Sequence, residues 1–101
     1  MGEKKEIIKK IRSIKEAIEE HFMKLEKELK NNDALNSYYH FKEILASMFP
    51  SLLDLYQRLG KGDQGKIVIE NLKGRLEKIL KENNLFDQYK QVYMNRFKKY
   101  P

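Results

Sequence analysis

The sequence predicts an all-α fold in which one domain, residues 1–101, forms an antiparallel four-helix bundle. Apolar residues recur at steps of three and four through most of the chain, which is the spacing of helix faces that pack on one another. The interruptions are short and rich in Asn, Asp and Gly, so consecutive helices should run in opposite directions. Residues 67–69 are β-branched, but no second segment could pair with them as a strand.

The first helix is expected over about residues 3–30. Its apolar stripe consists of Ile7, Ile11, Ile14, Ile18, Phe22, Leu25 and Leu29. The other positions carry charges of both signs, including Glu and Lys four residues apart, which support an exposed helix surface. The helix should end at Asn31, and Asp33 is a natural N-cap for the next helix.

The second helix is expected over about residues 34–59 and should be the central element, because it carries few charges. Its apolar stripe consists of Ala34, Tyr38, Phe41, Leu45, Met48, Leu52, Leu55 and Leu59. The stripe keeps its phase through Pro50, which lies off it. Since proline removes a backbone donor, we expect a helix that is kinked at Pro50 without losing register. Gly60 should end it in a left-handed conformation.

Two further helices are expected over about residues 66–82 and 85–99. A glycine-rich loop over residues 60–65 precedes the first of them, and two asparagines separate the pair. Asn84 and Asp87 resemble a capping box, which would make Asn84 the N-cap of the last helix. The alternative is one continuous helix over residues 66–99, which would give three long helices.

Composition limits the class of protein. The net charge is +6, the chain contains no cysteine, and its first residues are charged rather than apolar. Disulfides and thiolate metal sites are therefore excluded. No stretch approaches the roughly 18 uncharged apolar residues of a membrane span. We expect a soluble cytoplasmic protein with no membrane span and no cofactor.

The segment from Gly60 to Lys66 matches G-x-x-x-x-G-K, the pattern of a phosphate-binding loop. In such a loop a Ser or Thr follows the lysine and binds magnesium, whereas Ile67 follows here, and the chain has no room for the parallel sheet. We therefore predict no enzymatic activity and no catalytic residue. A plain loop between helices is the preferred interpretation, and an anion held by Lys61 and Lys66 at a helix N-terminus is the alternative.

The last helix combines aromatic and basic residues, which is how single-stranded nucleic acids are often held. Its aromatic residues are Phe86, Tyr89, Tyr93, Phe97 and Tyr100. Because they fall on one face, docking against the second helix is the preferred interpretation. A nucleic-acid or polyanion site is the alternative, and its candidate residues are Lys61, Lys66, Lys90, Arg96, Lys98 and Lys99.

Neither histidine belongs to a metal-binding motif. A metal site in a helical bundle uses Glu-x-x-His elements from two helices, but Ile18 and Ser37 stand three residues before His21 and His40. No metal site is predicted.

The second helix has more apolar residues than its stripe requires. The surplus residues that we assign to a partner-binding face are Tyr39, Ile44, Phe49, Leu53 and Tyr56. A helix that is apolar around so much of its circumference is either covered on several sides or binds something. The sequence therefore predicts a non-enzymatic interaction module that binds a partner protein, or associates with itself as a homodimer, through these residues.

In length, basic charge and four-helix organisation, the chain resembles the small bacteriocin immunity proteins of Gram-positive bacteria. Small helical proteins of phages and archaeal viruses are equally similar at this level. The resemblance implies a helical bundle and, as an alternative function, an immunity-type protein. It transfers no functional residue to this sequence.

Overall fold

The computed structural model describes residues 2–101, and within them it confirms an all-α fold without strands. The helices are α1 (Gly2–Lys30), α2 (Ala34–Glu43), α3 (Phe49–Arg58), α4 (Gly62–Glu82) and α5 (Phe86–Phe97). A π-helical segment, Ile44–Met48, joins α2 to α3. None of the described helices is both long and apolar enough to cross a lipid bilayer.

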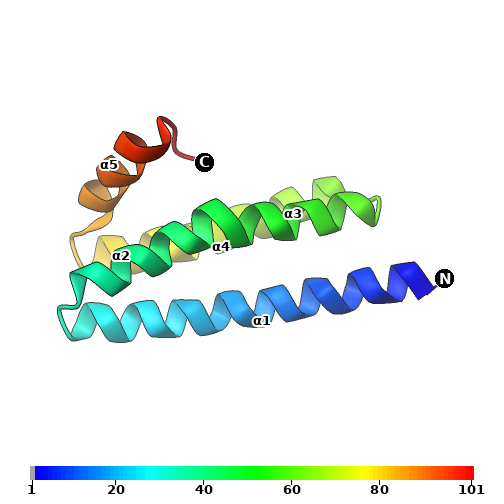
Figure 1. Cartoon of the computed structure of the whole chain (residues 1–101), viewed down its shortest axis with the longest axis horizontal. Helices are drawn as coiled ribbons and strands as arrows, with labels where there is room; N and C mark the ends of the chain where they lie inside the picture. The colour runs from blue at the N-terminus through cyan, green and yellow to red at the C-terminus, as the bar shows by residue number, and fades with distance from the viewer. Residues whose placement is uncertain (1) are drawn as a thin grey trace.

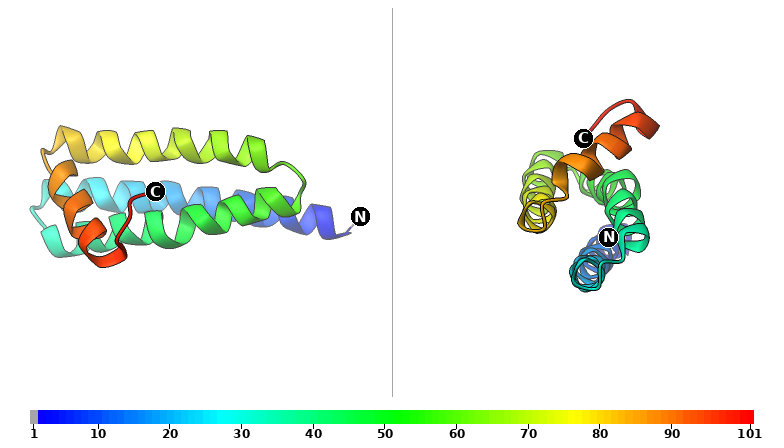
Figure 2. Two further views of the ribbon diagram at one scale, coloured as in Figure 1. Left: turned by 90° about the horizontal axis from the view of Figure 1, so that it is seen from above. Right: turned by 90° about the vertical axis from the view of Figure 1, so that its left-hand side faces the viewer.

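Three rods run along the length of the molecule, which measures 47 × 27 × 19 Å. The middle rod consists of α2, the π-helical segment and α3, and it is called the hub helix below. In Figure 1, α1 runs toward the left, the hub helix returns toward the right, and α4 runs back again. Both α1 and α4 pack against the hub helix, and the three rods lie at the corners of a triangle when the molecule is seen end on (Figure 2).

The short helix α5 is placed differently from the expected fourth member of a bundle. It crosses the α2 end of the hub helix instead of lying alongside the three rods (Figures 1 and 2). Asn84 adopts a left-handed φ of 57°, and the N–H of Leu85 donates to the carbonyl of Leu80 at 3.0 Å. This turn ends α4, so residues 66–99 do not form one helix. The capping-box prediction is wrong as well, because Leu85 and not Asn84 is the N-cap of α5.

The hub helix passes Pro50 through a change in helix type. Proline has no N–H, so it cannot donate to the carbonyl four or five residues earlier. Directly before Pro50, the N–H of Phe49 donates to the carbonyl of Ile44, five residues back, which is the π-helical pattern. Met48 and Phe49 keep right-handed helical backbone angles. The rod is therefore continuous, and a kink at Pro50 stays a prediction.

The turn between α3 and α4 is shorter than expected. Gly60 has the predicted left-handed conformation, with a φ of 78°, and the N–H of Lys61 donates to the carbonyl of Tyr56 at 2.8 Å. Because α4 begins already at Gly62, most of the expected glycine-rich loop is helix. Gly65 serves packing inside α4, since a Cβ atom there would lie 2.6 Å from the Cβ atom of Tyr56.

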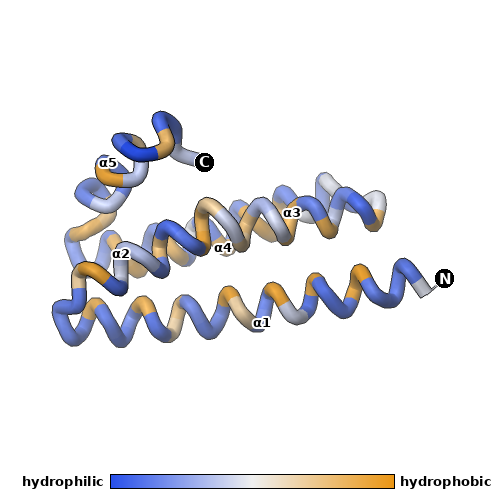
Figure 3. The backbone as a smooth tube through the Cα atoms, viewed as in Figure 1, coloured by the Kyte–Doolittle hydropathy of each residue, from blue (hydrophilic) through white to orange (hydrophobic). Residues whose placement is uncertain are grey.

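The hydrophobic core follows the hub helix. Every residue of the predicted α1 stripe is buried or packed against the core, and the hydrophobic positions of α1 face the hub helix in Figure 3. Asp33 caps α2 as predicted, because its carboxylate accepts a hydrogen bond of 3.2 Å from the N–H of Asn36. The aromatic face of α5 also packs inward, with Tyr89 and Tyr93 buried. These elements leave one face of the hub helix incompletely covered.

Candidate partner-binding groove

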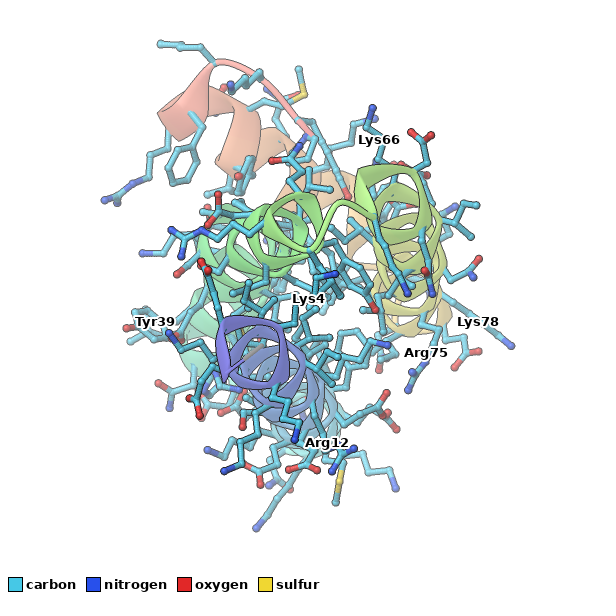
Figure 4. All side chains as sticks on the ribbon, turned by 90° about the vertical axis from the view of Figure 1, so that its right-hand side faces the viewer. Lys4, Arg12, Tyr39, Lys66, Arg75 and Lys78 are labelled. Carbon is cyan, nitrogen blue, oxygen red and sulfur yellow. The ribbon has the colours of Figure 1, made fainter. Side chains whose placement is uncertain are left out.

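The structure separates the five residues that the sequence assigned to a partner-binding face. Ile44, Phe49 and Tyr56 are 0%, 4% and 5% exposed, so they belong largely to the core of the chain itself. Their burial corrects the prediction of a free face, and its cause is that α1 and α4 cover the hub helix on two sides. Tyr39 is 53% exposed and projects outward from the hub helix (Figure 4). Leu53 is half-buried.

The six predicted anion-binding cations come from two parts of the chain. Lys61 and Lys66 flank the start of α4, whereas the other four lie on α5 or directly after it. Lys99 lies at the groove beside Glu70 of α4, one helical turn from Lys66. Of the five aromatic residues of this segment, Tyr89 and Tyr93 are buried, whereas Phe86, Phe97 and Tyr100 are partly exposed.

An apolar groove of about 500 Å³ lies between the hub helix, α4 and the end of α5. Its floor is formed by the buried residues Leu45, Phe49 and Tyr93. Leu53, Ile69 and Phe97 are partly exposed and line it further. Its remaining lining residues are Ala46, Pro50, Glu70, Lys73, Lys99 and Pro101. Phe49 and Leu53 of the predicted partner-binding set thus meet in this groove.

The groove is open because α5 is too short and is placed crosswise. Its 12 residues span about 18 Å, at about 1.5 Å per residue, and they cover the α2 part of the hub helix. The hydroxyls of Ser37 and Tyr89 share a buried hydrogen bond of 2.6 Å, and the rings of Phe41 and Tyr89 lie 5.8 Å apart. These contacts hold α5 over α2, so the junction of α3 with α4 keeps an uncovered apolar face.

The residues after α5 return toward α4 and complete one side of the groove. Lys98 adopts a left-handed φ of 64°, and its N–H donates to the carbonyl of Met94 at 2.8 Å. The hydroxyl of Tyr100 donates to a carboxylate oxygen of Glu77 at 2.7 Å. Burial, and after it this hydrogen bond, raises the pKa of Tyr100. Tyr100 therefore anchors the segment on α4, which places its neighbours Lys99 and Pro101 at the groove.

Positive charge predominates around the groove. Lys73 and Lys99 line it beside a single carboxylate, that of Glu70. The ammonium group of Lys73 lies 5.2 Å from the centre of the Tyr100 ring. Lys66 stands one helical turn before Glu70 and extends toward the side of the molecule on which α5 lies, whereas Arg12 lies on the opposite side (Figure 4). An apolar floor with cations at its edge is the chemical character of this site.

Sequence reasoning missed the contributions of α4 and α5 to the groove. The sequence analysis assigns Phe97 to the docking face of the last helix and gives Ile69 and Lys73 no role in a site. Their meeting depends on the crosswise position of α5, which no local pattern encodes.

The two histidines, which sequence analysis treated separately, meet between α1 and α2. Their rings pack edge to face, with centres 5.3 Å apart. His40 Nδ1 lies 2.7 Å from a carboxylate oxygen of Glu28, and His21 Nε2 lies 3.5 Å from one of Glu43. Within residues 2–101 no three side chains of the metal-binding types converge as a metal site. The cluster is a polar contact between two helices.

Comparison with known proteins gives no match to a family model, a curated protein or a solved structure. A function for this chain therefore has to be derived from its own surface.

Proposed function

We propose that this protein is a non-enzymatic interaction module that binds a partner protein through the apolar groove between the hub helix, α4 and the end of α5. The observation that carries the proposal is the lining of the groove. Nine of its twelve lining residues are apolar or aromatic, and Leu53, Ile69 and Phe97 are left partly exposed to solvent. A concave apolar surface of this kind, edged by charges, is typical of sites that bind other proteins.

The groove supports this function better than the alternatives considered from the sequence. Binding of nucleic acid would use stacked aromatic rings beside the cations, but two of the five candidate rings, those of Tyr89 and Tyr93, are buried, and the partly exposed ring of Phe97 lines the groove. The helical start of α4 leaves the Gly60–Lys66 segment with little of the expected loop, which weakens the proposal of an anion site there. An immunity-type function stays a prediction.

The test combines capture, identification and reconstitution. The full-length chain and its Leu53→Glu variant are immobilised and exposed to extract of the source cells, and each protein that only the wild type retains is identified. It is then purified and titrated by calorimetry. We expect a defined stoichiometry and a loss of affinity of at least about tenfold in Leu53→Glu, because a carboxylate would be buried in an apolar site.

Val92→Glu is the matched control, since Val92 is an exposed apolar residue (43%) of α5 that does not line the groove. Circular dichroism establishes that both variants are folded. The proposal is wrong if no protein is retained by the wild type, or if Leu53→Glu and Val92→Glu retain the same proteins. Sedimentation velocity distinguishes self-association: a dimer that Leu53→Glu dissociates would identify the partner as a second copy of the chain.

A further inference from the structure

The size of the groove limits what can occupy it. This inference rests on the proposed function and specifies the partner. The groove has twelve lining residues, whereas a stable interface between two folded proteins uses roughly 20–30 residues on each side. The groove itself offers a narrow contact surface and not the broad face that two folded proteins share. A short segment of a partner fits the available surface.

The chemistry of the walls selects the conformation of that segment. The groove is built from helices, and the described residues contain no strand whose edge could pair with an extended peptide. A segment that enters an apolar groove must satisfy its own backbone N–H and C=O groups, because unpaired polar groups are costly when water is removed. A helix meets this condition, and its apolar face would pack on Leu53, Ile69 and Phe97.

The charges around the groove select the polar face of that helix. Lys73 and Lys99 line the groove together with one acidic side chain, that of Glu70, so the lining side chains carry one more positive than negative charge. The carboxylate of Glu77 lies outside the groove lining and accepts the hydrogen bond from Tyr100. The net charge of +6 would also accelerate the approach of a negatively charged partner.

From the size, the helical walls and the cations, we propose that the groove binds a short amphipathic helix of a partner protein that carries acidic residues beside its apolar face. Leu53, Ile69 and Phe97 would receive the apolar side chains. Lys73 and Lys99 would face the carboxylates and thereby fix the orientation of the helix. Tyr100 acts as a positioning residue, because its bond to Glu77 holds Lys99 at the groove.

The experiment is a selection from a displayed library of amphipathic helices of about 16 residues, a length at which an isolated helix begins to form in water. Apolar residues are fixed at helical spacing, and the polar positions vary freely among Asp, Glu, Lys, Arg, Ser and Gln. The immobilised wild-type chain selects the binders, and the Leu53→Glu variant removes those that do not use the groove. We expect the remaining sequences to be acidic on average, compared with the starting library.

Two selected peptides are then synthesised with a fluorescent label and titrated by fluorescence anisotropy. We expect the double variant Lys73→Glu, Lys99→Glu to bind at least about tenfold more weakly than the wild type. The control is Lys9→Glu, which changes an exposed cation on α1 outside the groove. It should change the affinity by less than about threefold, since it alters net charge but not the groove. A single-stranded oligonucleotide of equal charge serves as the competing class of ligand.

The outcomes distinguish this inference from the proposed function. Selected peptides that depend on Leu53 but are neutral or basic would overturn the acidic helix and leave the groove as a binding site. An equal loss in Lys9→Glu and in the double variant would overturn the assignment of Lys73 and Lys99. If no peptide depends on Leu53, the inference is wrong, and the proposed function is then decided by the capture experiment with whole proteins. Binding of the oligonucleotide that Lys73→Glu, Lys99→Glu abolishes would point to nucleic acid as the ligand of these cations.

Discussion

The hub helix has two contrasting sides. Toward α1 it is closed: Ile18 and Leu25 of α1, and Leu52 of the hub helix, have no exposed surface. Toward the groove it is open, because Leu53, Ile69 and Phe97 are only partly covered. Leu52 and Leu53 are adjacent in the sequence and identical in chemistry, yet they lie in these different environments. The closed side therefore stabilises the fold, whereas the open side is the surface to which we assign the proposed binding.

The largest expected effect comes from truncating these two neighbours in turn. Leu52→Ala should lower the free energy of unfolding by about 2–5 kcal/mol, because it leaves a cavity in an enclosed site. Leu53→Ala should cost less than about 1 kcal/mol, since its side chain borders an open groove that solvent can refill. Urea denaturation followed by circular dichroism measures both values. Equal costs would show that the two sides of the hub helix do not differ.

The contact between α3 and α4 provides a second, smaller test of close packing. Gly65→Ala would place a Cβ atom 2.6 Å from the Cβ atom of Tyr56 and 2.8 Å from its Cγ atom, and neither is the end of a flexible chain. We expect a destabilisation of about 1–3 kcal/mol by overpacking. The same unfolding experiment measures it.

Gly74→Ala is the matched control, because Gly74 lies in the same helix and a Cβ atom there would contact nothing within 4 Å. Alanine restricts the unfolded chain and favours helix, so this variant should gain about 0.5–1 kcal/mol. The difference between the two variants isolates the steric effect. If Gly65→Ala is stabilised as much as Gly74→Ala, then α3 and α4 do not pack as closely as the structure shows.

The sequence alone predicted that the chain is helical and which residues of α1 face the hub helix. The stripe of α1 from Ile7 to Leu29 repeats at helical spacing, and such a repeat depends only on local geometry. Asp33 and Gly60 were recognisable for the same reason, because an N-cap and a left-handed helix end have their own residue preferences.

The open side could not be predicted in the same way. Ile44 and Leu53 are both apolar and both lie off the stripe of the hub helix, yet Ile44 is buried and Leu53 borders the groove. Which of them is covered depends on where α1, α4 and α5 lie, and so on tertiary contacts. The crosswise position of α5 follows the left-handed turn at Asn84, a residue that the sequence equally allowed as an N-cap.

The smallest expected effect concerns the edge between α1 and α4, where an ion pair joins the two outer rods. Arg75 of α4 donates two hydrogen bonds to the carboxylate of Glu19 on α1, one of them at 2.9 Å. The hydrogen bond to Arg75 lowers the pKa of Glu19 below its ordinary value of 4.5. The ion pair therefore stabilises the folded chain at pH values above 4.5. This stabilisation is lost as the pH falls through the lowered pKa of Glu19.

Glu19→Gln should accordingly lower the melting temperature at pH 7, and the difference from the wild type should shrink as the pH falls below 4.5. Both side chains are about half exposed, so solvent screening limits the effect to about 1 kcal/mol or less. Glu20→Gln is the control, because Glu20 is exposed on the same helix and forms no ion pair within residues 2–101. Thermal melts between pH 3 and pH 7 provide the measurement. A difference that persists unchanged at pH 3 would mean that Glu19 acts through packing, and the closed side would then extend to the edge between α1 and α4.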